Sequence, residues 1–264
     1  MLDLKVALKN LYTLPLIFGK IPPLFYKNSE INIKSYKSFV NATLSAKNAI
    51  FGHTKHVDNY IQNDSHIFFF LNGICTDKNV WEINAKEIET IFDFKVSSLY
   101  NPTHGVFHDI LECIFGREFD IEDEDTKELY TILRKALDEK EKVVVIAHSQ
   151  GGIIISQLVQ QLIDDSNPNL NKLEIYTFAS ASADMPTGDY HAEHFANKYD
   201  YVSRIGVLEY RNYFHGKVYE SSGAGHLLNI HYLEPFSKGM FCVGRSRLST
   251  YLKYKHKYYI SRND

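Results

Sequence analysis

The sequence predicts an α/β fold in which a doubly wound, mostly parallel sheet is flanked by helices. Short apolar runs that suit buried strands alternate along the chain with segments whose apolar residues recur at helical spacing. The clearest run is the β-branched stretch 143–146, which is typical of a strand buried on both faces of a parallel sheet. A helical pattern follows it directly, carried by Ile154, Ile155, Leu158 and Leu162.

The remaining elements follow from the same two periodicities and from turn residues. Before that strand we expect a helix over 33–51, a strand within 53–62, a strand from His66 to the turn Asn72-Gly73, a helix over 81–92, a strand over 95–100, a helix over 106–115, an acidic loop over 116–125 and a helix over 125–137 that Asp125 and Glu128 can cap. After it we expect a strand over 173–179, a loop over 181–190, a strand beginning at His194 and a last strand over 217–219.

Length and composition indicate one globular domain over residues 1–264, with an N-terminal arm (1–50) and a basic C-terminal tail (240–264) as appendages. The net charge of −3 argues against nucleic acid as a partner. Cys75, Cys113 and Cys242 have no metal-ligand spacing, and their odd number does not suit a disulfide framework. No apolar run reaches transmembrane length. The sequence does not define the oligomeric state.

Both ends of the chain allow two interpretations. The N-terminal 25 residues are apolar and lightly basic, but Asp3, prolines and a glycine interrupt them. They make a poor secretion signal, so we expect a cytoplasmic location. We expect this arm to dock on the domain; peripheral contact with a membrane, or a place at the substrate entrance, is the alternative. From Lys238 onward the chain is basic and rich in tyrosine. We expect a solvated or domain-packed helix there, with contact to an anionic surface as the alternative.

The turn between the 143–146 strand and its helix reads Ala147-His148-Ser149-Gln150-Gly151. A strand, a tight turn and a helix with a serine at the apex form the nucleophile-elbow pattern. Such a turn forces its apical residue into a strained conformation that lifts the Ser149 hydroxyl clear of the sheet. Small residues on either side let the strand and the helix approach closely. The simpler alternative is a serine that only caps the helix.

A serine hydroxyl becomes a good nucleophile when a base takes its proton and an acid orients that base. On this architecture the acid and then the histidine follow the serine, at the carboxyl ends of later strands. Asp200 and His226 each come just after a predicted strand, so we expect this pair. Asp184 and Asp189 are alternative acids, and His231 is the reserve base.

Two backbone N–H groups are expected to form an oxyanion hole. One belongs to Gln150, directly after the serine, and the other to Ile74, in the loop after the strand that starts at His66. Asn72, in the same loop, is a candidate for the pocket lining. His148 is expected to be a packing neighbour of the serine without a catalytic role.

Two further histidines are candidate metal ligands. His104 and His108 are four residues apart and could share a helix face, but no carboxylate accompanies them at a zinc-protease spacing. We therefore expect neither a metal nor a cofactor. Instead, His104 and Phe107 are expected to line the mouth of the pocket, where the 106–115 segment could gate access.

The chain resembles the α/β-hydrolase superfamily, and within it a lipase/esterase-like group of hydrolases known mainly from fungi and bacteria. The matching stretches run in the group's order over residues 67 to 233: FFFLNGI, YNPTHG, VVIAHSQGGII, EIYTFASA, HFANKYDYVSRIGVL and GHLLNIHYL. The resemblance implies Ser149 as nucleophile, Asp200 as acid and His226 as base, in agreement with the placement from strand ends. It implies hydrolysis of a carboxylic ester, either a lipid or another small molecule.

Two other functions are possible for the same site. An acyltransferase or thioesterase would differ only in what attacks the acyl-enzyme, and the sequence does not separate these from a hydrolase. A non-catalytic binding protein that keeps the hydrolase fold would have no need of a strained serine with an acid and a base placed after later strands.

Overall fold

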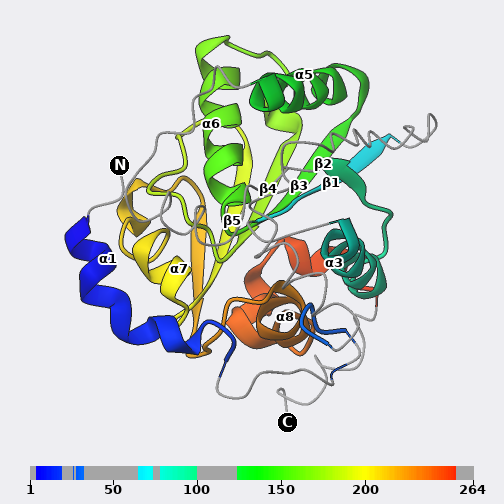
Figure 1. Ribbon diagram of the computed structural model, residues 1–264. Coiled ribbons are helices and arrows are strands. Elements are labelled where there is room, and N and C mark those ends of the chain that lie inside the picture. Colours follow the sequence, from blue (N-terminus) through cyan, green and yellow to red (C-terminus); the bar gives the residue numbers. More distant parts are fainter. Residues whose placement is uncertain are drawn as a thin grey trace.

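Six parallel strands form one sheet in the order β2-β1-β3-β4-β5-β6 (Figure 1). The computed structural model describes residues 4–19, 28–32, 65–73, 78–99 and 124–253, together with Tyr26. The strands are β1 His66–Leu71, β2 Ser97–Leu99, β3 Lys142–His148, β4 Leu173–Phe178, β5 His191–Asn197 and β6 Lys217–Ser221. Every neighbouring pair is parallel. The predicted fold class is therefore confirmed.

The helices vary widely in length. The α-helices are α1 Leu4–Asn10, α3 Lys78–Ile91, α5 Glu124–Glu139, α6 Gly151–Asp164, α7 Tyr201–Ile205 and α8 Glu234–Ser237. The 3-10 helices are η1 Leu11–Leu16, η3 Leu170–Lys172, η4 Arg211–Tyr213, η6 Met240–Arg245 and η7 Leu248–Tyr251, and η5 Leu228–Leu233 is π-helical. Within this part of the chain, no helix has both the length and the apolar character needed to cross a membrane.

The two faces of the sheet are covered by different helices. In Figure 1, α5 and α6 lie on one face and α3 and α8 on the other. Strand β3 contributes to both layers: Val143 and Val145 pack in the cluster with α5 and α6, while Val144 and Ile146 pack in the cluster with α3 and α8. All four are buried, which explains why this strand is a continuous apolar run rather than an alternating one.

The path of the chain reverses its direction across the sheet beside β3. From β1 the chain runs outward to β2 and then returns to β3 on the other side of β1, after which β4, β5 and β6 follow outward in turn. In such sheets ligands bind at the carboxyl ends of the strands where the strand order reverses. Here this point lies between β1 and β3, directly next to Ser149.

Some boundaries differ from those expected. Strand β2 covers only Ser97–Leu99, because it is an edge strand that pairs with the last three residues of β1. Strand β5 begins at His191, three residues before the predicted start, because 191–193 already pair with 174–176 of β4. The predicted elements over 33–51, 53–62 and 106–115 lie outside the described residues, as does most of the acidic loop.

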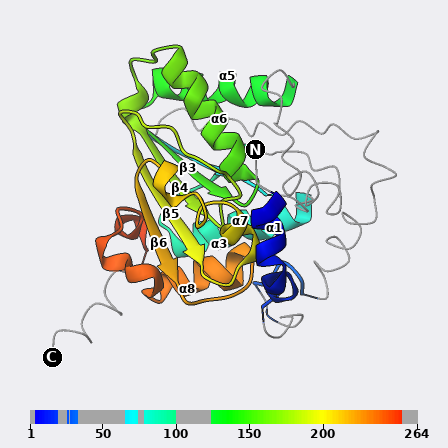
Figure 2. The ribbon, with the colours of Figure 1, turned by 90° about the vertical axis from the view of Figure 1, so that its left-hand side faces the viewer.

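The described parts of both chain ends pack on the domain. Helices α1 and η1 lie beside α7 in both views (Figures 1 and 2), with Val6 packed against Tyr201, Val202 and Ile205. Near the other end, the Arg247 N–H donates to Glu193 Oε1 over 2.7 Å, which joins the segment carrying η6 and η7 to β5.

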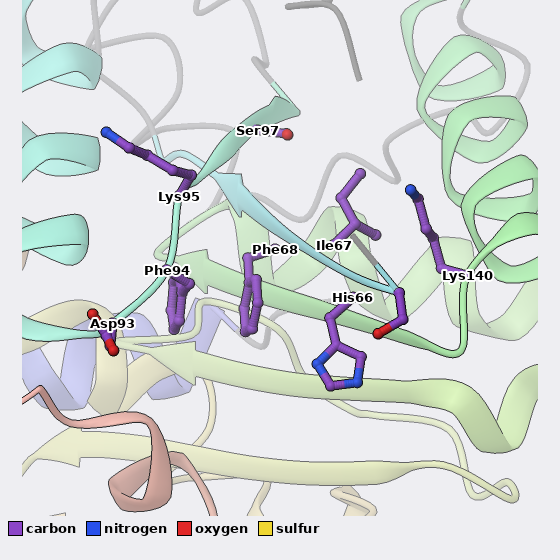
Figure 3. Close-up of a pocket in the computed structure, with 9 residues that line it drawn as sticks. His66, Ile67, Phe68, Asp93, Phe94, Lys95, Ser97 and Lys140 are labelled. Atoms are coloured by element: carbon purple, nitrogen blue, oxygen red, sulfur yellow. The ribbon is translucent and has the colours of Figure 1, made fainter. Parts of the chain in front are cut away.

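A hollow lies at the amino ends of β1 and β2 (Figure 3). The rings of Phe68 and Phe94 stack on one side of it, with centroids 3.8 Å apart, and Lys95 and Lys140 also line it. It is at the opposite end of the strands from Ser149, which directly follows β3. The site residues predicted from the sequence that the structure describes do not line this hollow.

Candidate active site

Ser149 occupies the tight turn between β3 and α6 in a strained conformation. Its φ is +57°, in the left-handed region that non-glycine residues rarely adopt. The Ser149 N–H donates to the Phe178 carbonyl over 3.0 Å, and the Ser149 carbonyl accepts from the N–H groups of Gly152 and Ala181 over 3.0 and 3.1 Å. These bonds to β4, to the loop after it and to α6 fix the residue from both sides, so the surrounding structure supports the strain.

Two glycines let neighbouring backbones approach the serine. A Cβ atom at Gly151 would lie 2.6 Å from the Leu71 carbonyl oxygen, so only glycine allows α6 to begin this close to the end of β1. A Cβ atom at Gly73 would lie 2.6 Å from the Ser149 Cβ. The loop after β1 is therefore in contact with the serine.

Asp200 stands just after β5, as the N-cap of α7. Its Oδ1 accepts the Val202 N–H over 3.0 Å, and its Oδ2 accepts the hydroxyls of Ser203 and Tyr232 over 3.1 and 2.5 Å. The carboxylate is fully buried. Burial alone would raise its pKa, but the neighbouring His226 and these hydrogen bonds together hold the pKa of Asp200 below its usual value.

His226 connects the carboxylate to the serine. Its Nδ1 lies 2.9 Å from Asp200 Oδ2 and 3.1 Å from Oδ1, and its Nε2 lies 2.9 Å from the Ser149 Oγ. An ionised carboxylate can only accept, so Nδ1 carries the hydrogen and Nε2 is left to accept from the serine hydroxyl. The structure thus brings together the serine, acid and histidine expected from the sequence.

The backbone of His226 is held at both of its polar groups. Its N–H donates to the Ile17 carbonyl over 2.8 Å, and its carbonyl lies 2.9 Å from His148 Nε2. Burial, and next the positive charge that His226 carries when it is protonated, lower the pKa of His148 to about 3, so the His148 ring is neutral. Because a carbonyl only accepts, Nε2 of His148 is the protonated nitrogen. His148, expected to be a packing neighbour, also donates a hydrogen bond to the loop that carries His226.

The alternative base and one alternative acid are engaged elsewhere. The Nδ1 of His231 accepts the Leu227 N–H over 3.0 Å, and its ring packs against Gly19 and Gly225. Burial lowers the pKa of His231 to about 4. Asp184 accepts a hydrogen bond of 3.0 Å from the hydroxyl of Ser156, a residue of α6.

The other predicted site residues are placed as follows. Gln150 is the N-cap of α6, so its position at the start of that helix is as expected. Asn72 is fully buried, and its side-chain amide donates to the Gly73 carbonyl over 3.0 Å. Ile74, His104 and Phe107 lie outside the described residues. Within the described residues, no three His, Cys, Asp or Glu side chains gather as a metal ion would require.

Sequence reasoning missed two side chains that contact the acid. Tyr232 donates to Asp200 Oδ2 and accepts the Asn197 N–H over 3.1 Å, and its hydroxyl lies 2.9 Å from the Ser203 Oγ. The spacing of Asp200 and Ser203 resembles a capping box and could have indicated the serine. No local pattern indicates Tyr232, which comes from η5, thirty-two residues further along the chain.

A third side chain, Glu30, is buried close to His226. It is 3% exposed, and its Oε1 accepts the Asn229 N–H over 2.8 Å. Its Oε2 has no hydrogen-bond partner among the described residues. Burial raises the pKa of Glu30 to about 7, and the nearby Glu87 adds to this rise. The hydrogen bond from the Asn229 N–H opposes it, as does, more weakly, the positive charge that His226 carries when it is protonated.

This raised pKa predicts a pH-dependent stability. In the range between pH 4.5 and 7, folded Glu30 binds a proton that the unfolded chain releases, so its contribution to stability is complete below pH 4.5 and is lost as the pH rises through 7. Between low and high pH, the free energy of unfolding should fall by roughly 3 kcal/mol. Urea unfolding of wild type and Glu30→Gln at pH 5 and pH 8 measures it: the wild type should lose more stability than the variant. Equal losses would contradict the prediction.

The described arrangement now identifies the fold. A serine in a strained turn follows a central strand, an acid follows a later strand, and a histidine follows the last one, all at one edge of a doubly wound parallel sheet. This is the α/β-hydrolase fold.

Comparisons with known proteins add little to this assignment. No family model matches the chain, and no curated protein matches it. Among solved structures, esterase Est22 is 10% identical with a TM-score of 0.41, over 69% of this chain and 71% of that one. A mutant of esterase rPPE is 9% identical with a TM-score of 0.48, over 95% and 98%. At these scores the likeness supports no conclusion about activity, and the fold assignment depends on the sheet and the turn themselves.

Proposed function

We propose that the protein is a serine hydrolase that cleaves carboxylic esters through an acyl-enzyme, with Ser149 as nucleophile, His226 as general base and Asp200 as the acid that orients it. The observation that carries the proposal is the pair of 2.9 Å contacts that join the Ser149 hydroxyl to His226 and His226 to Asp200, on a serine held at a φ of +57°. Asp184 and His231, the other candidates discussed above, take part in separate contacts.

The first chemical step follows from these distances. The Ser149 Oγ attacks the ester carbon as its proton passes to His226 Nε2, and the imidazolium that forms is stabilised by the buried Asp200 carboxylate. The tetrahedral intermediate carries its negative charge on the former carbonyl oxygen. It collapses when His226 gives the proton to the departing alcohol, which leaves an acyl-enzyme on Ser149.

The oxyanion requires donors that are already in place. We assign this role to the backbone N–H groups of Gln150 and Ile74, each typically contributing about 10²–10³ in rate. The position of Gln150 at the start of α6 supports it, because the positive end of the helix dipole lies there. Water then attacks the acyl-enzyme with His226 again as the base, releasing a carboxylic acid and restoring the serine.

An ester-hydrolysis assay tests the proposal directly. In a series of p-nitrophenyl esters from acetate to longer acyl chains, we expect a rapid burst of p-nitrophenol close to one per protein molecule, followed by slower turnover. The burst reports the acyl-enzyme, and the chain-length series reports the acyl preference. If adding an alcohol or thiol acceptor diverts the acyl group from water, the protein is an acyltransferase on the same site. Absence of both burst and turnover in folded protein would contradict the proposal.

A further inference from the structure

The N-terminal segment contacts the loop that carries the histidine at two separate points. The Ile17 carbonyl accepts the His226 N–H over 2.8 Å. Three residues after the histidine, Glu30 Oε1 accepts the Asn229 N–H over 2.8 Å, and the Asn28 carbonyl accepts the Asn229 side-chain amide over 2.9 Å. These contacts join residues about two hundred positions apart in the sequence.

The loop needs such support from outside. It begins with Gly223 and Gly225, and Gly225 has a φ of +94°, so the chain before His226 has little intrinsic preference for one path. Asn229 then falls in the first turn of η5, where a helix has no internal acceptor for its N–H groups. The carboxyl of Glu30 supplies that acceptor.

A buried carboxyl is a costly way to supply one hydrogen bond. Glu30 is 3% exposed, and its second oxygen has no hydrogen-bond partner among the described residues. Its pKa, raised to about 7 mainly by burial, reflects this cost. Buried polar groups that lack a hydrogen-bond partner are concentrated at functional sites.

We propose that Glu30 is a positioning residue for His226, which it serves by holding the Asn229 N–H and thereby fixing the loop that directs the imidazole at Ser149. This inference rests on the proposed function. Glu30 touches neither the Ser149 hydroxyl nor the imidazole in any hydrogen bond described for them, so it acts through the backbone of the loop.

Two replacements close to glutamate in size distinguish the effect of the hydrogen-bond acceptor from the effect of the space that the side chain fills. Glu30→Met removes the acceptor, while Glu30→Gln keeps a carbonyl oxygen that can accept from Asn229. A matched control is Glu193→Met. Glu193 is also a buried carboxyl that accepts a backbone N–H from a terminal segment, that of Arg247, but it lies at the start of β5, away from the carboxyl ends where the triad meets.

Steady-state kinetics well below the unfolding temperature provide the test. Because the base acts in the chemical step and does not bind substrate, Glu30→Met should lower kcat by about 10- to 100-fold with KM little changed. Glu30→Gln should restore kcat to near the wild-type value. Glu193→Met should reduce the unfolding temperature without this loss of kcat. Should Glu30→Met fail to fold, Glu30→Ala takes its place.

The possible outcomes distinguish a failure of the positioning role from a failure of the proposed function. An active wild type in which Glu30→Met and Glu193→Met have the same kcat, or in which Glu30→Gln is as slow as Glu30→Met, would overturn the positioning role alone. A folded wild type without any ester turnover would instead overturn the proposed function.

Discussion

Replacement of Ser149 by alanine is expected to lower kcat by about 10⁶-fold, which is the scale of loss when a nucleophile is removed from a triad that acts as a unit. The hydroxyl is the atom that forms the acyl-enzyme, so the burst should disappear as well. The fold should survive, because the contacts that hold this residue at its φ of +57° come from its backbone N–H and carbonyl, which alanine keeps. Ester turnover and thermal unfolding together measure both effects.

Ser156→Ala is the matched control for this change. Ser156, a residue of α6, is buried as Ser149 is, but its hydroxyl donates to Asp184 rather than to the histidine. We expect this variant to retain turnover. If Ser149→Ala and Ser156→Ala hydrolyse esters at comparable rates, Ser149 is not the nucleophile.

His226→Ala is expected to cause a loss of kcat of similar size, again about 10⁶-fold. Its Nε2 is 2.9 Å from the Ser149 Oγ, and no other base accepts the serine proton among the described contacts. His231→Ala should lower turnover far less, by about 10- to 100-fold at most, and should also lose stability, because the ring supports the loop beside His226 by accepting the Leu227 N–H and by filling space beside Gly225.

The comparison of these two variants decides which histidine is the base. It should be made at several pH values, so that a shifted optimum is not read as a loss of activity. Turnover that persists in His226→Ala and disappears in His231→Ala would reassign the base to His231.

The elements that depend on local sequence patterns could be predicted from the sequence alone. The strand at 143–146 is apolar on both faces because both faces are covered, so its assignment needed no knowledge of the rest of the fold. Asp200 and His226 could be paired because each directly follows a strand, and the carboxyl ends of parallel strands meet at one edge. The start of β5 was missed because His191 and Glu193 are polar residues in a strand that makes its contacts with β4 and with the C-terminal segment.

The contacts that surround the three central residues could not be predicted in this way. Tyr232 reaches Asp200 from the helical segment after the histidine, and Glu30 reaches Asn229 from the other end of the chain. Neither residue belongs to a local motif, and a buried glutamate near the N-terminus is, from sequence alone, most simply read as a surface residue. Only the folded chain brings these side chains to the loop.

Fluorophosphonate labelling followed by peptide mass mapping tests most directly whether one activated serine performs the chemistry. We predict one phosphonyl adduct per chain, located on the peptide that contains Ser149. We expect no adduct in Ser149→Ala and a large drop in the labelling rate in His226→Ala. Folded wild-type protein that takes up no label, or that carries it on another serine, would show that Ser149 is not the activated nucleophile.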